Sequence, residues 1–245
     1  MFLFRKNRDE NDDTGFTNEL PGKNDNKVIG DGGTIQTKNP LTSKERLMNK
    51  QKIVEKVESY VYDLFKNDDT GHDYYHMKRV AYMARHIAES ESADEFIAEV
   101  GGWLHDIGDK KLFKEPLLVK KDMYSFLERL NLTVEQLSQI EKAVSGVSFS
   151  GGQKPLSKEG EIVQDADRLD AIGALGIART FAYGGSNQQL IHSDESKNTS
   201  IQHFYDKLLL LKDLINTDTA KKLAEERHQF MNLYLEQFYS EWNIN

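Results

Sequence analysis

The 245-residue sequence contains no cysteine. This absence excludes a disulfide framework, a thiolate nucleophile, cysteine-ligated zinc and an iron–sulfur cluster, because each of them needs the Cys sulfur. Any metal ion that the chain binds must therefore be held by His, Asp and Glu side chains.

Long apolar runs are also lacking. The longest is the four leucines Leu208 to Leu211, far below the roughly 20 residues that a membrane-spanning helix needs. The first residues, Met1 to Lys6, place a short apolar stretch ahead of the charges, which is the wrong order for a secretory signal. We therefore expect no membrane span and a cytoplasmic protein.

Positive charge is scarce as well. The 32 Lys and Arg residues face 40 Asp and Glu residues, which gives a net charge of -8. A broad basic surface for duplex nucleic acid is therefore not expected, although a local basic cluster can still hold a small phosphorylated ligand. With 38% hydrophobic and 10% aromatic residues, the composition is that of a globular protein.

The chain changes character near residue 43. Residues 1–43 carry apolar side chains without a period among Asn, Asp, Gly and Thr, and we expect a disordered tail there. Gly30 to Gly33 resembles a phosphate loop only superficially, since no hydrophobic strand precedes it and no Gly-Lys-Ser/Thr follows. Residues 44–245 are expected to form one domain.

Apolar residues recur at helical spacing through this domain, and no alternating stretch competes with them. We therefore predict an all-α fold, with a loop at 148–157 and a polar insertion from 184. Gly101 and Gly102 inside a helix indicate that another backbone packs closely there, because each Gly costs about 1 kcal/mol relative to Ala. The predicted helices are 43 to the break at 67–71, 73–90, 94–105, 116–130, one introduced by Thr133, 159–178, 201–215 and 218–242.

Three groups of ionisable residues interrupt these helices. His105 and Asp106 follow an apolar run, and Gly108 ends the helix so that both can turn toward one ion. His72 and His76 lie four positions apart, with Asp73 as a helix cap or a functional carboxylate. The third group lies on one apolar helix, where two like charges one turn apart need a cation or Arg168 to compensate them. It consists of Asp165, Asp167 and Asp170.

Taken singly, each group has a structural explanation, but their order resembles the H...HD...D signature of the HD-domain metal-dependent phosphohydrolases. The fuller strings are similar to the bacterial subfamily that includes YpgQ and YedJ, and the resemblance runs from about Glu45 to Trp242. These strings are GHDYYH at 71–76, HDIGDKKL at 105–112, EGEIVQDADRLDAIGA at 159–174 and GIAR at 176–179.

The resemblance implies a compact helical bundle around one divalent ion, with Asp106 also orienting the attacking water. We expect manganese, with magnesium, cobalt, nickel and iron as alternatives, because His and Asp ligation tolerates all of them. The ligands that the motif positions imply are His76, His105, Asp106 and Asp167.

The substrate needs cations, and two lie beside the implied ligands: Lys111, which we also count as catalytic, and Arg168. Lys110 is expected to be a solvated loop lysine. Asp109 is predicted either to hold the lysine, to assist proton transfer, or simply to be solvated. Further substrate-binding candidates are His72, Asp73, Arg79 and Arg179. Glu99 can approach the site or lie on an exposed helix face.

The resemblance favours a nucleotide phosphoanhydride as substrate, as in nucleoside triphosphate pyrophosphohydrolases. Two alternatives stay open: an enzyme of the same fold that cleaves a phosphomonoester or phosphodiester of a nucleotide, and a non-catalytic nucleotide-binding regulator. A homo-oligomer also stays open, because part of the leucine-rich 208–215 segment can serve as a dimer face or as core.

Overall fold

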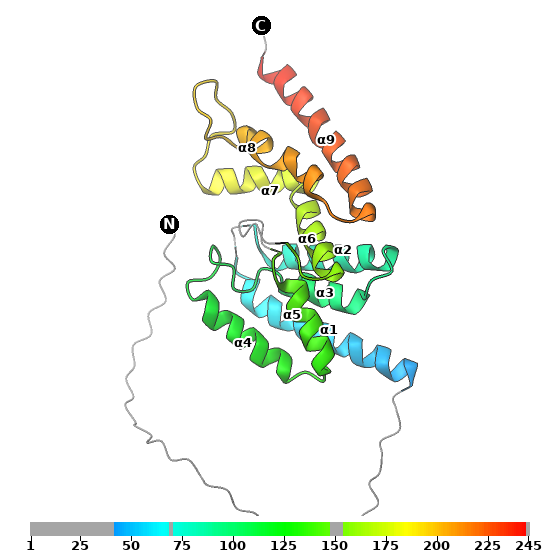
Figure 1. The fold of residues 1–245 in the computed structure, drawn as a ribbon. Helices are drawn as coiled ribbons and strands as arrows, with labels where there is room; N and C mark the ends of the chain where they lie inside the picture. The colour runs from blue at the N-terminus through cyan, green and yellow to red at the C-terminus, as the bar shows by residue number, and fades with distance from the viewer. Residues whose placement is uncertain (1–41, 69–70, 148–153, 244–245) are drawn as a thin grey trace, which may run out of the picture. The chain divides into compact units, whose positions relative to one another are not determined.

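Helices begin where the sequence places a capping side chain ahead of an apolar stretch. We describe residues 42–68, 71–147 and 154–243 of a computed structural model (Figure 1). Their elements, in chain order, are α1 (Ser43–Phe65), α2 (Tyr74–Ser90), α3 (Glu95–Leu104), α4 (Pro116–Glu128), α5 (Val134–Val144), α6 (Lys158–Asp170), α7 (Gly173–Ser186), α8 (Ser200–Asp206), the 3-10 helix η2 (Leu208–Leu214) and α9 (Asp218–Trp242).

Two capping boxes confirm predicted helix starts. At α1, the backbone N–H of Glu45 donates to the Thr42 hydroxyl, and the Glu45 carboxylate accepts from the Thr42 N–H. Thr133 and Gln136 make the same reciprocal pair at α5. Each box satisfies backbone donors that the first turn of a helix leaves without partners.

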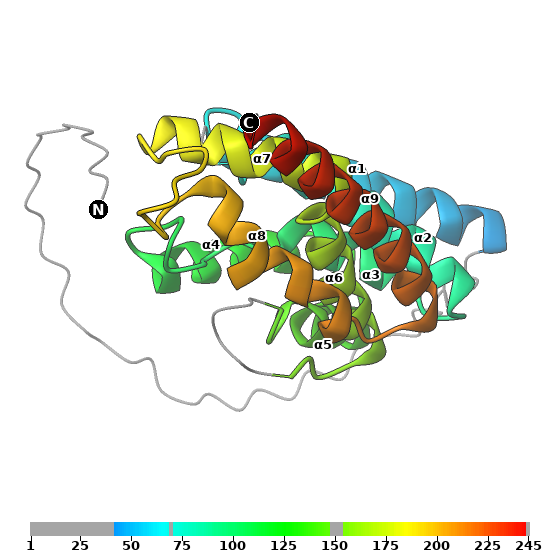
Figure 2. The ribbon, with the colours of Figure 1, turned by 90° about the horizontal axis from the view of Figure 1, so that it is seen from above.

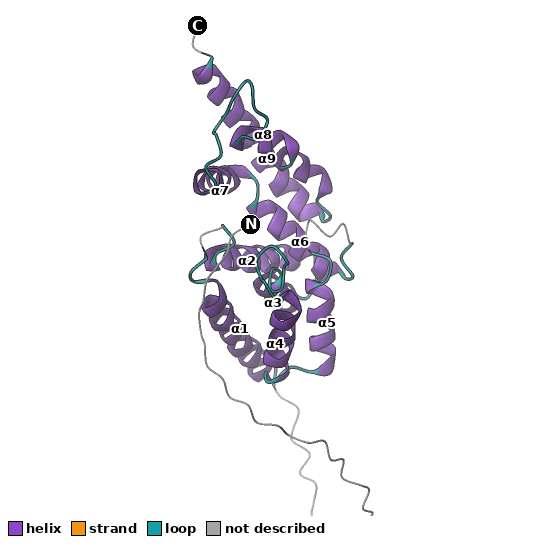
Figure 3. Ribbon diagram, turned by 90° about the vertical axis from the view of Figure 1, so that its left-hand side faces the viewer, coloured by secondary structure: helices purple, strands orange, loops and turns teal. Residues whose placement is uncertain are grey.

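The all-α prediction is confirmed. Within the described ranges the regular elements are helices, joined by loops that carry one isolated bridge between Leu190 and Thr199 (Figure 3). No helix in these ranges is long and apolar enough to cross a membrane. The predicted tail over 1–43 lies almost entirely outside the described residues, as do residues 148–153 of the predicted loop.

Two predicted helices are each divided in the structure. The helix expected over 159–178 breaks after α6, where Gly173 has φ +74° and begins α7. The helix expected over 201–215 breaks at Lys207 (φ -142°, ψ -58°), after which the chain continues as η2. Both predictions were wrong because apolar spacing reports burial, and burial continues through each break. Helix α7 also extends to Ser186, past the predicted start of the insertion.

Helix α6 is the central element. It packs against α2, α3, α5, α7 and α9, and in Figure 1 it runs between α1–α5 and α7–α9. Figure 2 shows α9 passing over α6. One hydrophobic cluster, around Trp103, joins α1 to α5, whereas the other, around Leu169, joins α6 to α9 and also includes residues of α2 and α3. The start of α2, the end of α3 and the end of α6 meet between the clusters.

Gly102 lets α2 and α3 approach backbone to backbone. A Cβ atom on Gly102 would lie 2.6 Å from Cα and 2.9 Å from N of Ala81, closer than real Cβ atoms come to a backbone. A Cβ atom on Gly101 would lie 3.0 Å from Cγ2 of Val163 and 3.2 Å from Cβ of Ala143, which are side-chain atoms. The prediction that another backbone packs closely is therefore confirmed at Gly102, and this approach sets the spacing between the start of α2 and the end of α3.

We expect Gly102→Ala to lower the free energy of unfolding by about 3 kcal/mol, because the added methyl group meets backbone that cannot yield. Gly185→Ala is the matched control: a Cβ there meets nothing within 4 Å, so stability should stay unchanged or rise by up to about 1 kcal/mol. Urea unfolding followed by circular dichroism measures both. Equal stability of the two variants would show that the α2–α3 approach is not tight.

Candidate metal centre

Four side chains from the ends of three helices converge between the hydrophobic clusters. His76 lies in the first turn of α2, His105 caps the end of α3 with Asp106 beside it, and Asp167 lies near the end of α6. The Nε2 atom of His76 is 3.6 Å from an oxygen of Asp106 and 3.6 Å from an oxygen of Asp167. The Nε2 atom of His105 is 3.4 and 3.8 Å from the same two oxygens.

Three of these converging atoms have no hydrogen-bond partner. His76 Nε2, His105 Nε2 and Asp106 Oδ2 are all buried, and an unsatisfied buried polar atom is costly. The distances between the facing atoms exceed hydrogen-bond length but suit atoms that share an ion at about 2.1 Å from each. Within the described part of the chain, His76, His105 and Asp167 each offer a ligand atom, and these three atoms lie within 4.8 Å of one another. The donor set therefore fits a divalent cation.

Hydrogen bonds on the far side of each imidazole fix the nitrogen that faces the cluster. His76 Nδ1 lies 2.7 Å from an oxygen of Asp170, and His105 Nδ1 lies 2.8 Å from the carbonyl oxygen of Gly102. Both partners are acceptors, so each Nδ1 carries the proton and donates it. In the neutral rings the lone pairs of both Nε2 atoms consequently point into the cluster, as metal-binding histidines require.

The charges of the cluster shift the pKa values of two of its members. Burial disfavours the charged form of His105, but the carboxylates of Asp106 and Asp167 outweigh it and raise the pKa of His105 to about 9. Burial by itself raises the pKa of Asp106, but the neighbouring histidines outweigh it and hold the pKa of this carboxyl well below its ordinary value. Protons thus compete with a metal ion for the same nitrogen atoms.

Asp170 gathers two arginines that the sequence analysis assigns to substrate. Arg79 donates from Nε and Nη2 to its two oxygens at 2.7 and 3.0 Å, and Arg179 donates from Nη1 at 2.7 Å. Burial alone would raise the pKa of Asp170, but these bonds and that of His76 hold it well below its ordinary value. Arg79 and Arg179 therefore bind Asp170, and their expected contact with phosphate stays a prediction.

Asp73 and His72 precede α2 at the edge of the cluster. Asp73 is the N-cap of α2, and its carboxylate accepts from the backbone N–H of His76 at 2.8 Å. The capping alternative is thus present, and it also anchors a candidate ligand. The half-buried His72 ring lies edge-on to His76, with centroids 5.6 Å apart. Burial lowers the pKa of His72, while Asp106 opposes the shift. Substrate roles for both residues stay predictions.

The two other predicted substrate-binding cations, Lys111 and Arg168, have different surroundings. Asp109 accepts from the backbone N–H of Lys111 at 2.7 Å, so it shapes the exposed loop that carries this lysine. Arg168 instead donates to the carbonyl oxygen of Leu214 and lies 3.9 Å from Asp165. Its side chain is 13% exposed. These contacts turn Arg168 toward η2, and its expected role in substrate binding stays a prediction.

Lys207, at the break between α8 and η2, is not among the residues predicted from the sequence. Burial lowers its pKa, and the charges of Asp167, Lys111 and Arg179 also act on it. Its charge therefore lies within electrostatic range of Asp167, one of the implied ligands. No local pattern singles out this lysine, because the break that positions it interrupts a segment with continuous helical spacing.

Several residues that were predicted to lie on the surface are buried or half-buried in the structure. Glu99 is 6% exposed and lies 3.6 Å from Arg85, so it lies neither on an exposed face nor in the cluster. Four further histidines were predicted to lie on the surface, but His192 packs against Phe238, Tyr239 and Trp242. His203 and His228 are half-buried as well, and His86 is exposed as predicted.

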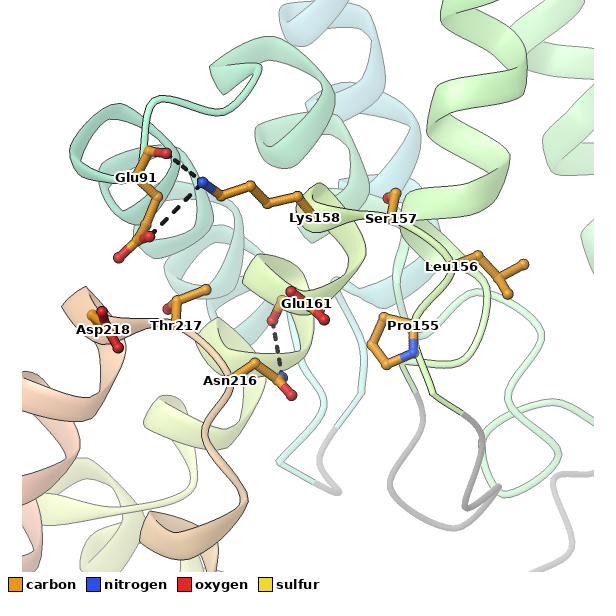
Figure 4. A pocket seen from close by; sticks show the side chains of 9 residues that line it. All are labelled: Glu91, Pro155, Leu156, Ser157, Lys158, Glu161, Asn216, Thr217 and Asp218. Carbon is orange, nitrogen blue, oxygen red and sulfur yellow. Dashed lines mark hydrogen bonds and ion pairs between the residues drawn. The ribbon is translucent and has the colours of Figure 1, made fainter.

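A surface hollow of about 430 Å³ lies elsewhere and shares no residue with the cluster. Figure 4 shows Lys158 reaching the backbone oxygen and the carboxylate of Glu91 across it. Glu91 in turn accepts from the backbone and hydroxyl of Thr219. These polar groups are satisfied within the chain, so the hollow is not a competing candidate for the catalytic site.

Comparisons with known proteins agree with this geometry. A family described as HD domain matches residues 73–172. The chain is 40% identical over 194 residues to the uncharacterized protein YpgQ of Bacillus subtilis (strain 168), covering 78% of this chain and 94% of YpgQ.

Solved structures give the same result. The crystal structure of B. subtilis YpgQ in complex with ADP has a TM-score of 0.70 at 39% identity and covers 79% of this chain and 97% of YpgQ. An HD-superfamily hydrolase from Bacillus thuringiensis has a TM-score of 0.68 at 41% identity, covering 80% of this chain and 100% of that protein.

The raised pKa of His105 predicts how the metal-free fold responds to pH. The folded-state pKa of about 9 lies above the ordinary 6.5, so protonated His105 adds stability that is fully present below pH 6.5 and lost as the pH rises to about 9. In protein treated with a chelator, the free energy of unfolding should fall by up to about 3 kcal/mol over this range.

Urea titrations at pH values across this window measure the slope. His105→Gln is the reference, because glutamine does not titrate. A wild-type slope no steeper than that of the variant would contradict the electrostatics described for the cluster.

Proposed function

Because the chain belongs to the HD-domain superfamily of metal-dependent phosphohydrolases, we propose that it hydrolyses a phosphoanhydride bond of a nucleotide, as a nucleoside triphosphate pyrophosphohydrolase does. The observation that carries the proposal is the convergence of His76 Nε2, His105 Nε2 and Asp106 Oδ2, buried and without hydrogen-bond partners. The ADP complex of YpgQ supports a nucleotide as the ligand.

Four side chains would hold one divalent ion, manganese by preference: His76, His105, Asp106 and Asp167. When bound, such an ion lowers the pKa of water toward neutrality and neutralises charge on the phosphoryl group. The chain therefore needs no cysteine or serine nucleophile, in keeping with the absence of cysteine.

The exposure of the two carboxylates indicates from which side solvent and substrate reach the site. The side chain of Asp167 is 28% exposed and that of Asp106 is 13%, whereas both imidazoles are 1% exposed. Water and substrate therefore approach from the Asp167 side. Asp106, which faces both imidazoles, is positioned to orient the attacking water and accept a hydrogen bond from it.

Positive charge on the same side suits a polyphosphate. Lys111 and Lys207 are near enough to influence each other, and Lys207 also interacts with Asp167. We assign both to phosphate oxygens of the substrate, where a lysine acts as a mobile point charge. His72, whose ring lies edge-on to that of His76, stays a further candidate for substrate binding.

The test is release of phosphate or pyrophosphate from nucleoside mono-, di- and triphosphates with manganese, magnesium, cobalt and nickel, before and after chelation. We expect turnover of a triphosphate that stops on chelation. The double variant His105→Ala with Asp106→Ala should lose at least about a hundredfold in kcat/KM. Loss of a residue that merely hydrogen-bonds to a metal ligand already lowers metal affinity or activity by about 10- to 100-fold.

His86→Ala is the matched control, since His86 is an exposed histidine of α2, and it should retain full activity. Product identity decides the bond cleaved: a nucleoside as product would instead indicate a phosphomonoesterase. Nucleotide binding without turnover under any metal would contradict the proposal and leave a regulator.

A further inference from the structure

Asp170 is a buried carboxylate that reaches toward the metal centre without being one of its implied ligands. It is 4% exposed and ends α6, one turn after Asp167. One of its oxygens lies 2.7 Å from Nδ1 of His76, on the side of the ring opposite the cluster. No atom of Asp170 belongs to the converging set, so its effect on the ion must pass through His76.

The two arginines hold this carboxylate in one orientation. Arg79 comes from α2, one turn after His76, and grips both oxygens, while Arg179 comes from α7. Arg179 also donates from Nη2 to the carbonyl oxygen of Gly71 at 2.7 Å. The same guanidinium thus ties α7 and the segment before α2 to Asp170, and the carboxylate cannot rotate away without breaking its bonds to α2 and α7.

We propose that Asp170 is the positioning residue of the metal centre: clamped between Arg79 and Arg179, it keeps the proton of His76 on Nδ1 and so aims the Nε2 lone pair at the ion. A ring without this acceptor distributes its proton between both nitrogens and is free to rotate about its χ2 bond. Either change removes a ligand atom from the cluster.

At His105, the acceptor for the Nδ1 proton is a backbone carbonyl oxygen, that of Gly102. The two histidines therefore depend on different acceptors, and only His76 depends on a side chain that mutation can remove. This difference makes His105 an internal reference within one protein.

Asp165 offers a matched control on the same helix. It is 0% exposed and, like Asp170, accepts four hydrogen bonds, which come from the backbone and side chains of Asn216 and Thr217. It makes no contact with His76 among the described interactions. Removing either carboxylate costs stability, but only removal of Asp170 changes the metal centre.

The experiment compares full-length wild type with Asp170→Asn, Asp170→Ala and Asp165→Asn. Affinity for Mn²⁺ is measured by electron paramagnetic resonance, and the protonation of each imidazole nitrogen by ¹⁵N NMR of the metal-free protein. Asp170→Asn keeps the size of the side chain and guards against a variant that fails to fold.

We expect both Asp170 variants to lose 10- to 100-fold in Mn²⁺ affinity, with a proton appearing on Nε2 of His76 and no change at His105. Asp165→Asn should keep wild-type affinity while unfolding at lower urea. Affinity within twofold of wild type in both Asp170 variants, an unchanged His76 tautomer, or an equal loss in Asp165→Asn would overturn the proposal.

This inference rests on the proposed function only in taking His76 as a ligand. A protein that binds Mn²⁺ but hydrolyses no nucleotide defeats the proposed reaction and leaves the role of Asp170 intact. Full turnover with unaltered metal binding in the Asp170 variants defeats the role of Asp170 and leaves the proposed reaction intact.

Discussion

Two imidazole nitrogens face two carboxylates across gaps of 3.4 to 3.8 Å at the ends of three helices, and the rest of the structure serves this arrangement. The gaps are too long for hydrogen bonds, and three of the facing atoms have no other partner. In the metal-free chain, a proton on His105 compensates the carboxylates. A divalent ion does so better, because it satisfies several atoms at once.

Packing away from the cluster determines its spacing. Gly102 brings the backbones of α2 and α3 together, which places His76 at the start of one helix opposite His105 at the end of the other. Asp73 caps α2 through the N–H of His76 itself. The turn at Gly173 then lets α7 return Arg179 to Asp170. Rigid helix ends thus orient the side chains more narrowly than loops would.

Local signals were sufficient to predict the helix starts, because a capping box is written within a few positions. The converging residues were named from the family resemblance of several motif strings, since each ionisable group taken alone has a structural explanation. Partnerships across the chain were not predictable in this way. Arg79 lies 91 positions from Asp170, and from sequence the neighbouring Arg168 was the obvious partner for the acidic group. Lys207 was missed because its position depends on a break that apolar spacing does not reveal. Whether the four converging residues bind an ion stays a prediction.

The central claim is that these four side chains share one divalent cation. A crystal of the full-length protein grown with Mn²⁺, with diffraction measured at the manganese absorption edge, tests it most directly. The account predicts one anomalous peak about 2.2 Å from His76 Nε2, His105 Nε2 and the nearest oxygens of Asp106 and Asp167, absent from crystals of His105→Ala. A peak elsewhere, or none among these residues at saturating Mn²⁺, would contradict it.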